Sequence, residues 1–112
     1  MKSSDELQID ALMERYFEGL YHSDSEILRT VFHPELAYVN ATDGNHEFMD
    51  LETYMTRIDN REPPAKRGDP RRESVDRMTM MGRDYQDLLT LIHTDDGWKV
   101  ITKVFAYRAK ED

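Results

Sequence analysis

Cysteine is absent from the 112 residues of this chain, which excludes disulfides, thiolate metal sites and cysteine nucleophiles. A chain without disulfides fits the reducing cytoplasm, which is the location we expect. Long apolar runs are also lacking, because the longest is the stretch 104–107, far short of the roughly 20 residues that span a bilayer. The first ten residues hold no apolar segment typical of a signal peptide. We therefore expect neither export nor a membrane partner.

Basic residues are few beside the acidic ones, with 15 Lys and Arg against 23 Asp and Glu and a net charge of -8. This excess of negative charge repels polyphosphates, so nucleic acid is not an expected partner. The charge is uneven: residues 1–60 hold 4 basic and 13 acidic groups, and residues 61–112 hold 11 and 10. Apolar residues make up 38% of the chain, enough for the small core of one domain over residues 1–112.

Three helices are predicted in the first half of the chain. Ser3 and Ser23 each stand three residues before a glutamate, which is the spacing of a capping box at a helix start. Apolar residues recur every three or four positions after Ser3, so the first helix is expected to reach about residue 22. The second helix should end before Pro34, because the residue before a proline avoids helical geometry. Asp50 can cap a third helix.

The rest of the chain reads mainly as strands. Asp95-Asp96-Gly97 is a strong signal for a hairpin turn between the last two of them. Trp98 and Phe105 lie seven positions apart, and this odd spacing predicts opposite faces of the last strand. Helices followed by antiparallel strands indicate an α+β domain whose sheet curls around the helices. The predicted strands are Leu36–Thr42, Ser74–Met81, Tyr85–His93 and Trp98–Tyr107.

Four stretches of sequence carry a family resemblance: Tyr16–Asp24, Leu28–Val39, Tyr85–Leu91 and Gly97–Phe105. Their order and spacing resemble the nuclear transport factor 2-like superfamily, and within it the SnoaL-like and ketosteroid-isomerase-like family described as putative lumazine-binding. The resemblance implies a cone-shaped, curved antiparallel sheet packed on three N-terminal helices, with a pocket between the first helix and the concave face. It also implies a homodimer formed through the outer face of the sheet. One family strand is missing here, because only Thr79–Met81 fill its place.

The ketosteroid isomerases of this superfamily suggest three site positions. Tyr16 resembles their oxyanion-hole tyrosine, and Asp87 falls near their protonated aspartate, which donates a hydrogen bond. Asn40 occupies the position of their general base, and an amide cannot accept the substrate proton as a carboxylate does. Steroid isomerisation is therefore not expected. The structural alternatives are a buried helix tyrosine and a sheet carboxylate bonded to its neighbours.

Metal and cofactor sites are not predicted, because the four histidines have no partner at helical spacing. Three kinds of function stay open. The first is a noncatalytic homodimer that binds a small apolar or aromatic ligand. The second is a cofactor-independent lyase, isomerase or cyclase with Asp87 or His93 as acid or base and Tyr16 as oxyanion donor. The third is a protein-association module with a vestigial pocket. The candidate ligand-binding residues are Tyr16, Tyr38, Asn40, Tyr54, Asp87 and Trp98.

Overall fold

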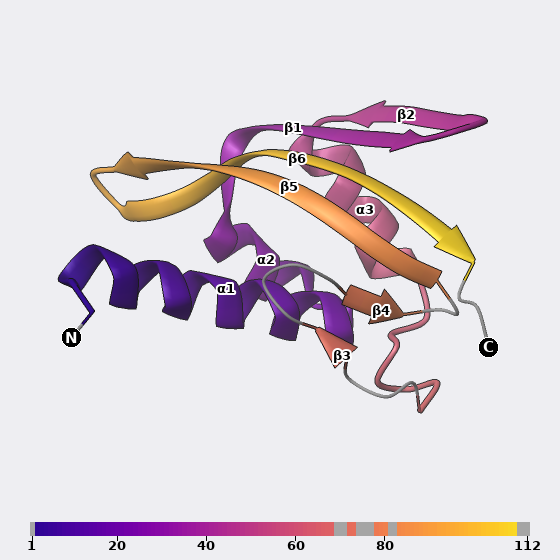
Figure 1. The fold of residues 1–112 in the computed structure, drawn as a ribbon, viewed down its shortest axis with the longest axis horizontal. Helices are drawn as coiled ribbons and strands as arrows, with labels where there is room; N and C mark the ends of the chain where they lie inside the picture. The colour runs from indigo at the N-terminus through magenta and orange to yellow at the C-terminus, as the bar shows by residue number, and fades with distance from the viewer. Residues whose placement is uncertain (1, 69–71, 74–77, 81–82, 110–112) are drawn as a thin grey trace.

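A computed structural model describes residues 2–68, 72–73, 78–80 and 83–109 of the chain. Helices and strands in this part follow the α+β class expected from the sequence, with the helices in the first half (Figure 1). No helix in the described ranges is both long and apolar enough to cross a membrane. The elements are α1 (Ser4–His22), α2 (Ser25–Val31), β1 (Phe32–Thr42), β2 (Asn45–Met49), α3 (Leu51–Asn60), β3 (Arg72–Glu73), β4 (Met78–Met80), β5 (Arg83–Thr94) and β6 (Gly97–Ala109).

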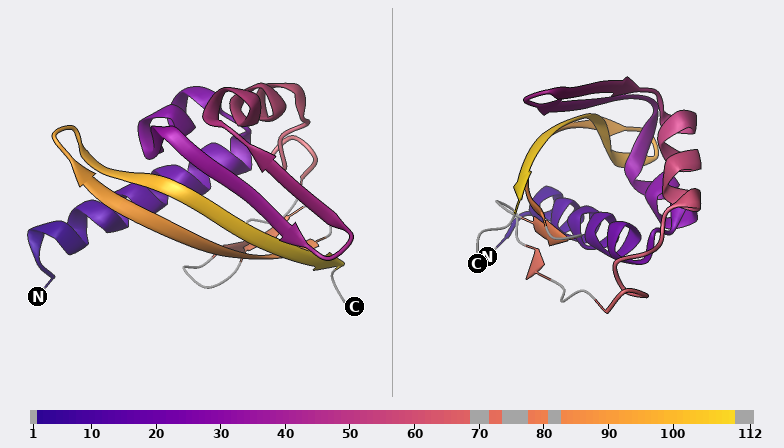
Figure 2. Two further views of the ribbon diagram at one scale, coloured as in Figure 1. Left: turned by 90° about the horizontal axis from the view of Figure 1, so that it is seen from above. Right: turned by 90° about the vertical axis from the view of Figure 1, so that its right-hand side faces the viewer.

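The strands form one six-stranded sheet in the order β2-β1-β6-β5-β4-β3. It bends around α1, while α2 and α3 lie beside β1, which gives the expected cone shape (Figure 2). The sheet is mixed and not wholly antiparallel as expected, because β1 and β6 run parallel. The reason is topological: β2 takes one edge of β1 through a hairpin, and β6 reaches the other edge after its own hairpin with β5.

Two strands were not predicted from the sequence, β2 and the short β3. The sequence analysis assigned no strand to the β2 segment, yet it pairs with β1 across a tight connection in which Gly44 has a φ of 78°, a backbone conformation that favours glycine. β4 lies inside the predicted strand Ser74–Met81, whose residues 74–77 and 81 fall outside the described ranges. The predicted loss of a family strand falls partly on the same undescribed residues.

The helix caps agree with the sequence at two of three positions. Ser3 accepts a hydrogen bond from the Glu6 amide, and Asp50 accepts one from the Thr53 amide. The prediction that Ser23 caps the second helix is wrong. Asp24 takes that role, whereas Ser23 ends α1 in a left-handed conformation with a φ of 48°. Because α1 continues to His22, Ser23 must reverse the chain, and the next residue is left to cap α2.

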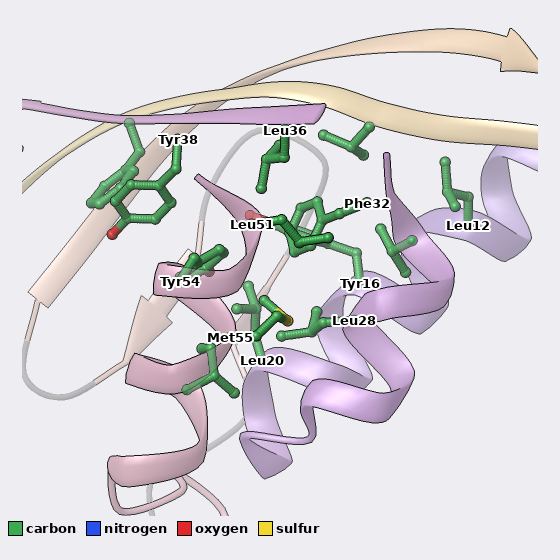
Figure 3. Packing of buried hydrophobic residues seen from close by; sticks show 14 residues of the cluster. Leu12, Tyr16, Leu20, Leu28, Phe32, Leu36, Tyr38, Leu51, Tyr54 and Met55 are labelled. Carbon is green, nitrogen blue, oxygen red and sulfur yellow. The ribbon is translucent and has the colours of Figure 1, made fainter. Parts of the chain in front are cut away.

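The core lies between the concave face of the sheet and the three helices (Figure 3). Gly19 brings α1 and α2 together, since a Cβ at this position would lie 2.7 Å from Leu28 Cγ. Aromatic rings connect the layers: Tyr16 of α1 meets Phe32 edge-on, with ring centroids 6.0 Å apart. The buried apolar residues are Leu12, Tyr16, Leu20, Leu28, Val31, Phe32, Leu36, Tyr38, Leu51, Tyr54, Met55, Ile58, Val100 and Phe105.

A bulge in the β5–β6 hairpin decides which side chains face the core. The pairing runs regularly from Thr94 with Gly97 to Leu91 with Val100, then shifts so that Thr90 pairs with Thr102. Ile101 is therefore the extra residue of a bulge, which reverses the alternation of β6. Trp98 pairs with His93 and Phe105 with Asp87. The two β5 residues lie six apart on one face, so the prediction that Trp98 and Phe105 face opposite sides is wrong.

Candidate functional site

Three polar side chains from three elements meet on the concave side of the sheet: Tyr16 of α1, Asp87 of β5 and Lys103 of β6. Lys103 Nζ donates to the Tyr16 hydroxyl oxygen at 2.5 Å and to Asp87 Oδ2 at 3.3 Å. The Tyr16 hydroxyl in turn donates to Asp87 Oδ2. Tyr16 is 2% exposed and Lys103 4% exposed. We call these three residues the polar cluster.

The bulge at Ile101 places Lys103 in this cluster. If the pairing of the hairpin end continued without a bulge, Lys103 would lie opposite Leu88 and point to the outer face. With the bulge, Lys103 pairs with Leu89, and its side chain shares the concave face with Asp87. Lys103 was missed in the sequence analysis. The predicted strand Trp98–Tyr107 holds two lysines, Lys99 and Lys103, and a lysine in a strand is typical of a surface residue until the register is known.

Aromatic rings surround the Lys103 ammonium. Its Nζ lies 4.8 Å from the centre of the Tyr16 ring, 5.3 Å from that of Phe105 and 5.7 Å from that of Tyr54, within the range of cation–π attraction. The ring of Tyr38 extends this group of rings, because its centroid is 4.3 Å from that of Tyr54 and 5.0 Å from that of Phe105. We call the four rings of Tyr16, Tyr38, Tyr54 and Phe105 the aromatic wall. The predicted ligand-binding residues Tyr16, Tyr38 and Tyr54 are thus brought together.

The protonation of the cluster follows from its burial and its charges. Burial alone lowers the pKa of Lys103, but Asp87 and then Tyr16 raise it by more, so this pKa lies well above its ordinary value of 10.5. Burial raises the pKa of Tyr16 well above its ordinary value of 10.0, against the opposing effect of Lys103. At neutral pH the cluster therefore contains an ammonium and a neutral phenol. The hydroxyl proton of Tyr16 is already used in the hydrogen bond to Asp87.

Asp87 is only partly satisfied within the cluster. Its Oδ2 atom accepts from Tyr16 and from Lys103, whereas Oδ1 is buried and has no hydrogen-bond partner among the described residues. A buried acceptor without a partner is costly, because it has lost its hydrogen bonds to water. Its side chain retains 13% exposure, against 5% for the side chain of Lys103. The cluster therefore has one acceptor to offer.

Asn40 also lies on the concave face, but its amide is engaged elsewhere. Its Nδ2 atom donates to Glu47 Oε1 at 3.2 Å, and its Oδ1 atom accepts from the Thr42 amide at 3.0 Å. Glu47 is paired in turn with Arg57 of α3 at 2.8 Å. These contacts connect β1, β2 and α3. They also occupy both the nitrogen and the oxygen of the Asn40 side-chain amide with neighbouring residues.

His93 and Trp98 lie apart from the polar cluster, at the turn end of the β5–β6 hairpin. Their rings contact each other with centroids 4.9 Å apart, and His93 is exposed. Trp98 Nε1 donates to Asp5 Oδ1 of α1 at 3.4 Å. Because a strand rises about 3.3 Å per residue, His93 lies roughly 20 Å from Asp87 along β5. The structure does not bring either residue to Tyr16 or Lys103.

Other sites are limited in the described part of the chain. Within it, no three His, Cys, Asp or Glu side chains are grouped so that they could hold a metal ion. A surface hollow of about 530 Å³ lies between α1 and α2, and no member of the polar cluster lines it. Four of its lining residues are acidic, and the Asp24 carboxylate already caps α2. The lining residues are Glu14, Arg15, Glu18, Asp24, Glu26, Ile27 and Thr30.

Comparison with solved structures shows the fold. An NTF2-like protein of unknown function from Silicibacter pomeroyi has a TM-score of 0.71 at 18% identity, covering 96% of this chain and 100% of that one. An NTF2-like protein of unknown function from Methylobacillus flagellatus has a TM-score of 0.71 at 14% identity, covering 96% of each chain. A cystatin-like fold protein from Burkholderia xenovorans has a TM-score of 0.63 at 17% identity, covering 94% and 92%.

At the level of sequence, no curated protein matches the chain. Residues 4–106 match one family model, and this match extends over α1 to β6. The resemblance inferred from four stretches of sequence is thereby confirmed. The chain belongs to the family described as "Putative lumazine-binding".

Proposed function

We propose that this protein binds a small, largely apolar or aromatic ligand between α1 and the concave face of the sheet, next to Tyr16, Asp87 and Lys103. The observation that carries the proposal is the partly satisfied polar cluster inside an aromatic wall. A core that serves stability alone gains little from a buried ion pair. Departures from ordinary core packing are concentrated at functional sites. Membership of the family is consistent with a domain that binds small ligands.

Binding is favoured over acid–base catalysis by the direction of the hydrogen bonds. An oxyanion donor must offer its proton to the substrate, but the Tyr16 proton is donated to Asp87. Asp87 accepts from both Tyr16 and Lys103, a polarity opposite to that of the donor expected from the ketosteroid isomerases, and this supports binding over catalysis. The other candidate base, His93, lies at the far end of the hairpin.

The proposed site is tested with a panel of bicyclic heteroaromatic compounds that includes lumazine. We expect at least one to bind with a dissociation constant below 1 mM (on the order of −4 kcal/mol), measured by isothermal titration calorimetry. Asp87→Asn should weaken that binding about tenfold or more, because it removes a charge-assisted acceptor. The control His93→Ala, at an exposed position of the same strand, should leave the affinity unchanged. Equal affinities for wild type and Asp87→Asn would contradict the proposed site.

We further propose that the protein is a homodimer formed through the outer face of the sheet. Phe48 is 79% exposed and Leu88 70% exposed. The register places Phe48 beside Val39, Val39 beside Val104 and Val104 beside Leu88, so four apolar side chains form one row across four strands. Phe48 and Leu88 are exposed, and Val39 and Val104 between them are half-buried. An apolar row with exposed ends is typical of an interaction surface, and a second copy supplies the same row by two-fold symmetry.

Leu88→Asp is expected to convert the dimer to a monomer, because it places a charge in the middle of this apolar row. Sedimentation equilibrium at several protein concentrations measures the change directly. Leu7→Asp is the matched control, since Leu7 is also exposed, at 57%, but lies on α1. A wild-type protein that sediments as a monomer, or a Leu88→Asp variant that stays dimeric, would contradict this interface.

A further inference from the structure

The charges of the polar cluster constrain the ligand that can enter it. One ammonium, on Lys103, is paired with one carboxylate, on Asp87, so the pair is neutral as a whole. The rings around the ammonium belong to Tyr16, Tyr54 and Phe105. A ligand carboxylate or phosphate would meet the charge of Asp87, and a ligand ammonium would meet that of Lys103. Each would have to lose water in an interior where the described residues offer no free countercharge.

The hydrogen bonds of the cluster add a second constraint. Asp87 Oδ2 accepts hydrogen bonds from two donors, and Tyr16 already uses its only hydroxyl proton in one of them. The group left without a partner among the described residues is Asp87 Oδ1, which is an acceptor. Asp87 is also the less buried member of the ion pair. A ligand that approaches from this side gains most if it brings a donor to the unpaired oxygen.

From these two constraints we infer that the ligand is an uncharged aromatic molecule that donates an N–H or O–H hydrogen bond to Asp87 Oδ1. This inference rests on the proposed binding function and names the ligand class of the same site. The hydrogen-bond polarity is opposite to the one that the ketosteroid isomerase resemblance implies, in which the protein donates and the ligand accepts. A ligand donor satisfies Oδ1 and leaves the contacts of Lys103 with Asp87 and Tyr16 in place.

Four probe compounds test the inference with the 112-residue chain. Quinolin-2(1H)-one carries an N–H donor, and 1-methylquinolin-2-one has the same ring system and carbonyl without that donor. Naphthalene-2-carboxylate and naphthalen-2-ylmethylammonium are an anion and a cation of similar size. Isothermal titration calorimetry at pH 7 measures the affinity of each. Amide chemical shifts of Asp87 and Lys103 in labelled protein show whether a probe binds at the cluster.

We expect quinolin-2(1H)-one to bind at least tenfold more tightly than each of the other three compounds, and to shift the amide signals of Asp87 and Lys103. In Asp87→Ala the advantage over the methylated compound should disappear, whereas His93→Ala should retain it. If Asp87→Ala does not fold, the relative affinities of the four probes for the wild-type protein still test the inference. Tighter or equal binding of the methylated or a charged probe at the cluster would overturn the inference while supporting the proposed function. Binding of none of the four would overturn both.

Discussion

Lys103→Met is expected to lower the free energy of unfolding by about 3 to 5 kcal/mol, the usual cost of breaking a buried ion pair. The methionine fills a similar volume, but the Asp87 carboxylate keeps its place in an aromatic interior without a countercharge. Urea unfolding followed by circular dichroism measures the loss. Variants must be compared at one protein concentration, because association also contributes to apparent stability.

Two further variants separate the lost charge pair from the lost side chain. Lys66→Met removes an exposed lysine of the segment after α3, and its effect should stay within about 0.5 kcal/mol. The double variant Lys103→Met/Asp87→Asn should recover most of the loss, because the unpaired buried charge is removed as well. A Lys103→Met variant as stable as the wild type would contradict the burial and pairing of this lysine.

Stability is expected to fall steeply above about pH 10. The pKa values of Tyr16 and Lys103 are both raised in the folded protein, from ordinary values of 10.0 and 10.5. The contribution of these two groups to the free energy of unfolding is therefore fully present below pH 10. It declines at higher pH, because the unfolded chain releases protons that the folded chain retains. Each retained proton lowers the stability by about 1.4 kcal/mol per pH unit. Burial also raises the pKa of Tyr38, which acts in the same direction.

Urea unfolding between pH 8 and pH 11.5 measures this decline. Tyr16→Phe should reduce the slope above pH 10 by about one proton, or roughly 1.4 kcal/mol per pH unit. A stability that stays constant up to pH 11 would show that neither group holds its proton more tightly when the protein is folded. A slope that Tyr16→Phe leaves unchanged would assign the effect to other groups.

Much of the fold could be predicted because its signals are local. Capping residues such as Ser3 and Asp50, the spacing of apolar residues in α1 and the turn after Thr94 each depend on a few neighbouring residues. The parallel pairing of β1 with β6 could not be predicted in this way, since it depends on how distant strands meet. The cap of α2 was placed one residue too early, at Ser23, because both of two adjacent polar residues can accept from a helix start.

The candidate site could be predicted in part. Tyr16 and Asp87 were identified by resemblance, and the structure brings them into direct contact. Lys103 could not be found from the sequence, because its side depends on the bulge at Ile101, which leaves no local signature. Lys103 adds a positive charge and two hydrogen bonds to the pair formed by Tyr16 and Asp87. Lys103 donates to the phenol oxygen of Tyr16 and pairs with Asp87, so it contacts both residues to which the resemblance gave a role.

A crystal structure of the protein with quinolin-2(1H)-one tests the central claim most directly. The expected result is electron density for the compound between α1 and the concave face of the sheet, with its N–H group within hydrogen-bond distance of Asp87 Oδ1 and its ring against the aromatic wall. The contradicting result is an interior filled by the protein's own side chains, with the compound absent or bound elsewhere on the molecule, such as in the hollow between α1 and α2.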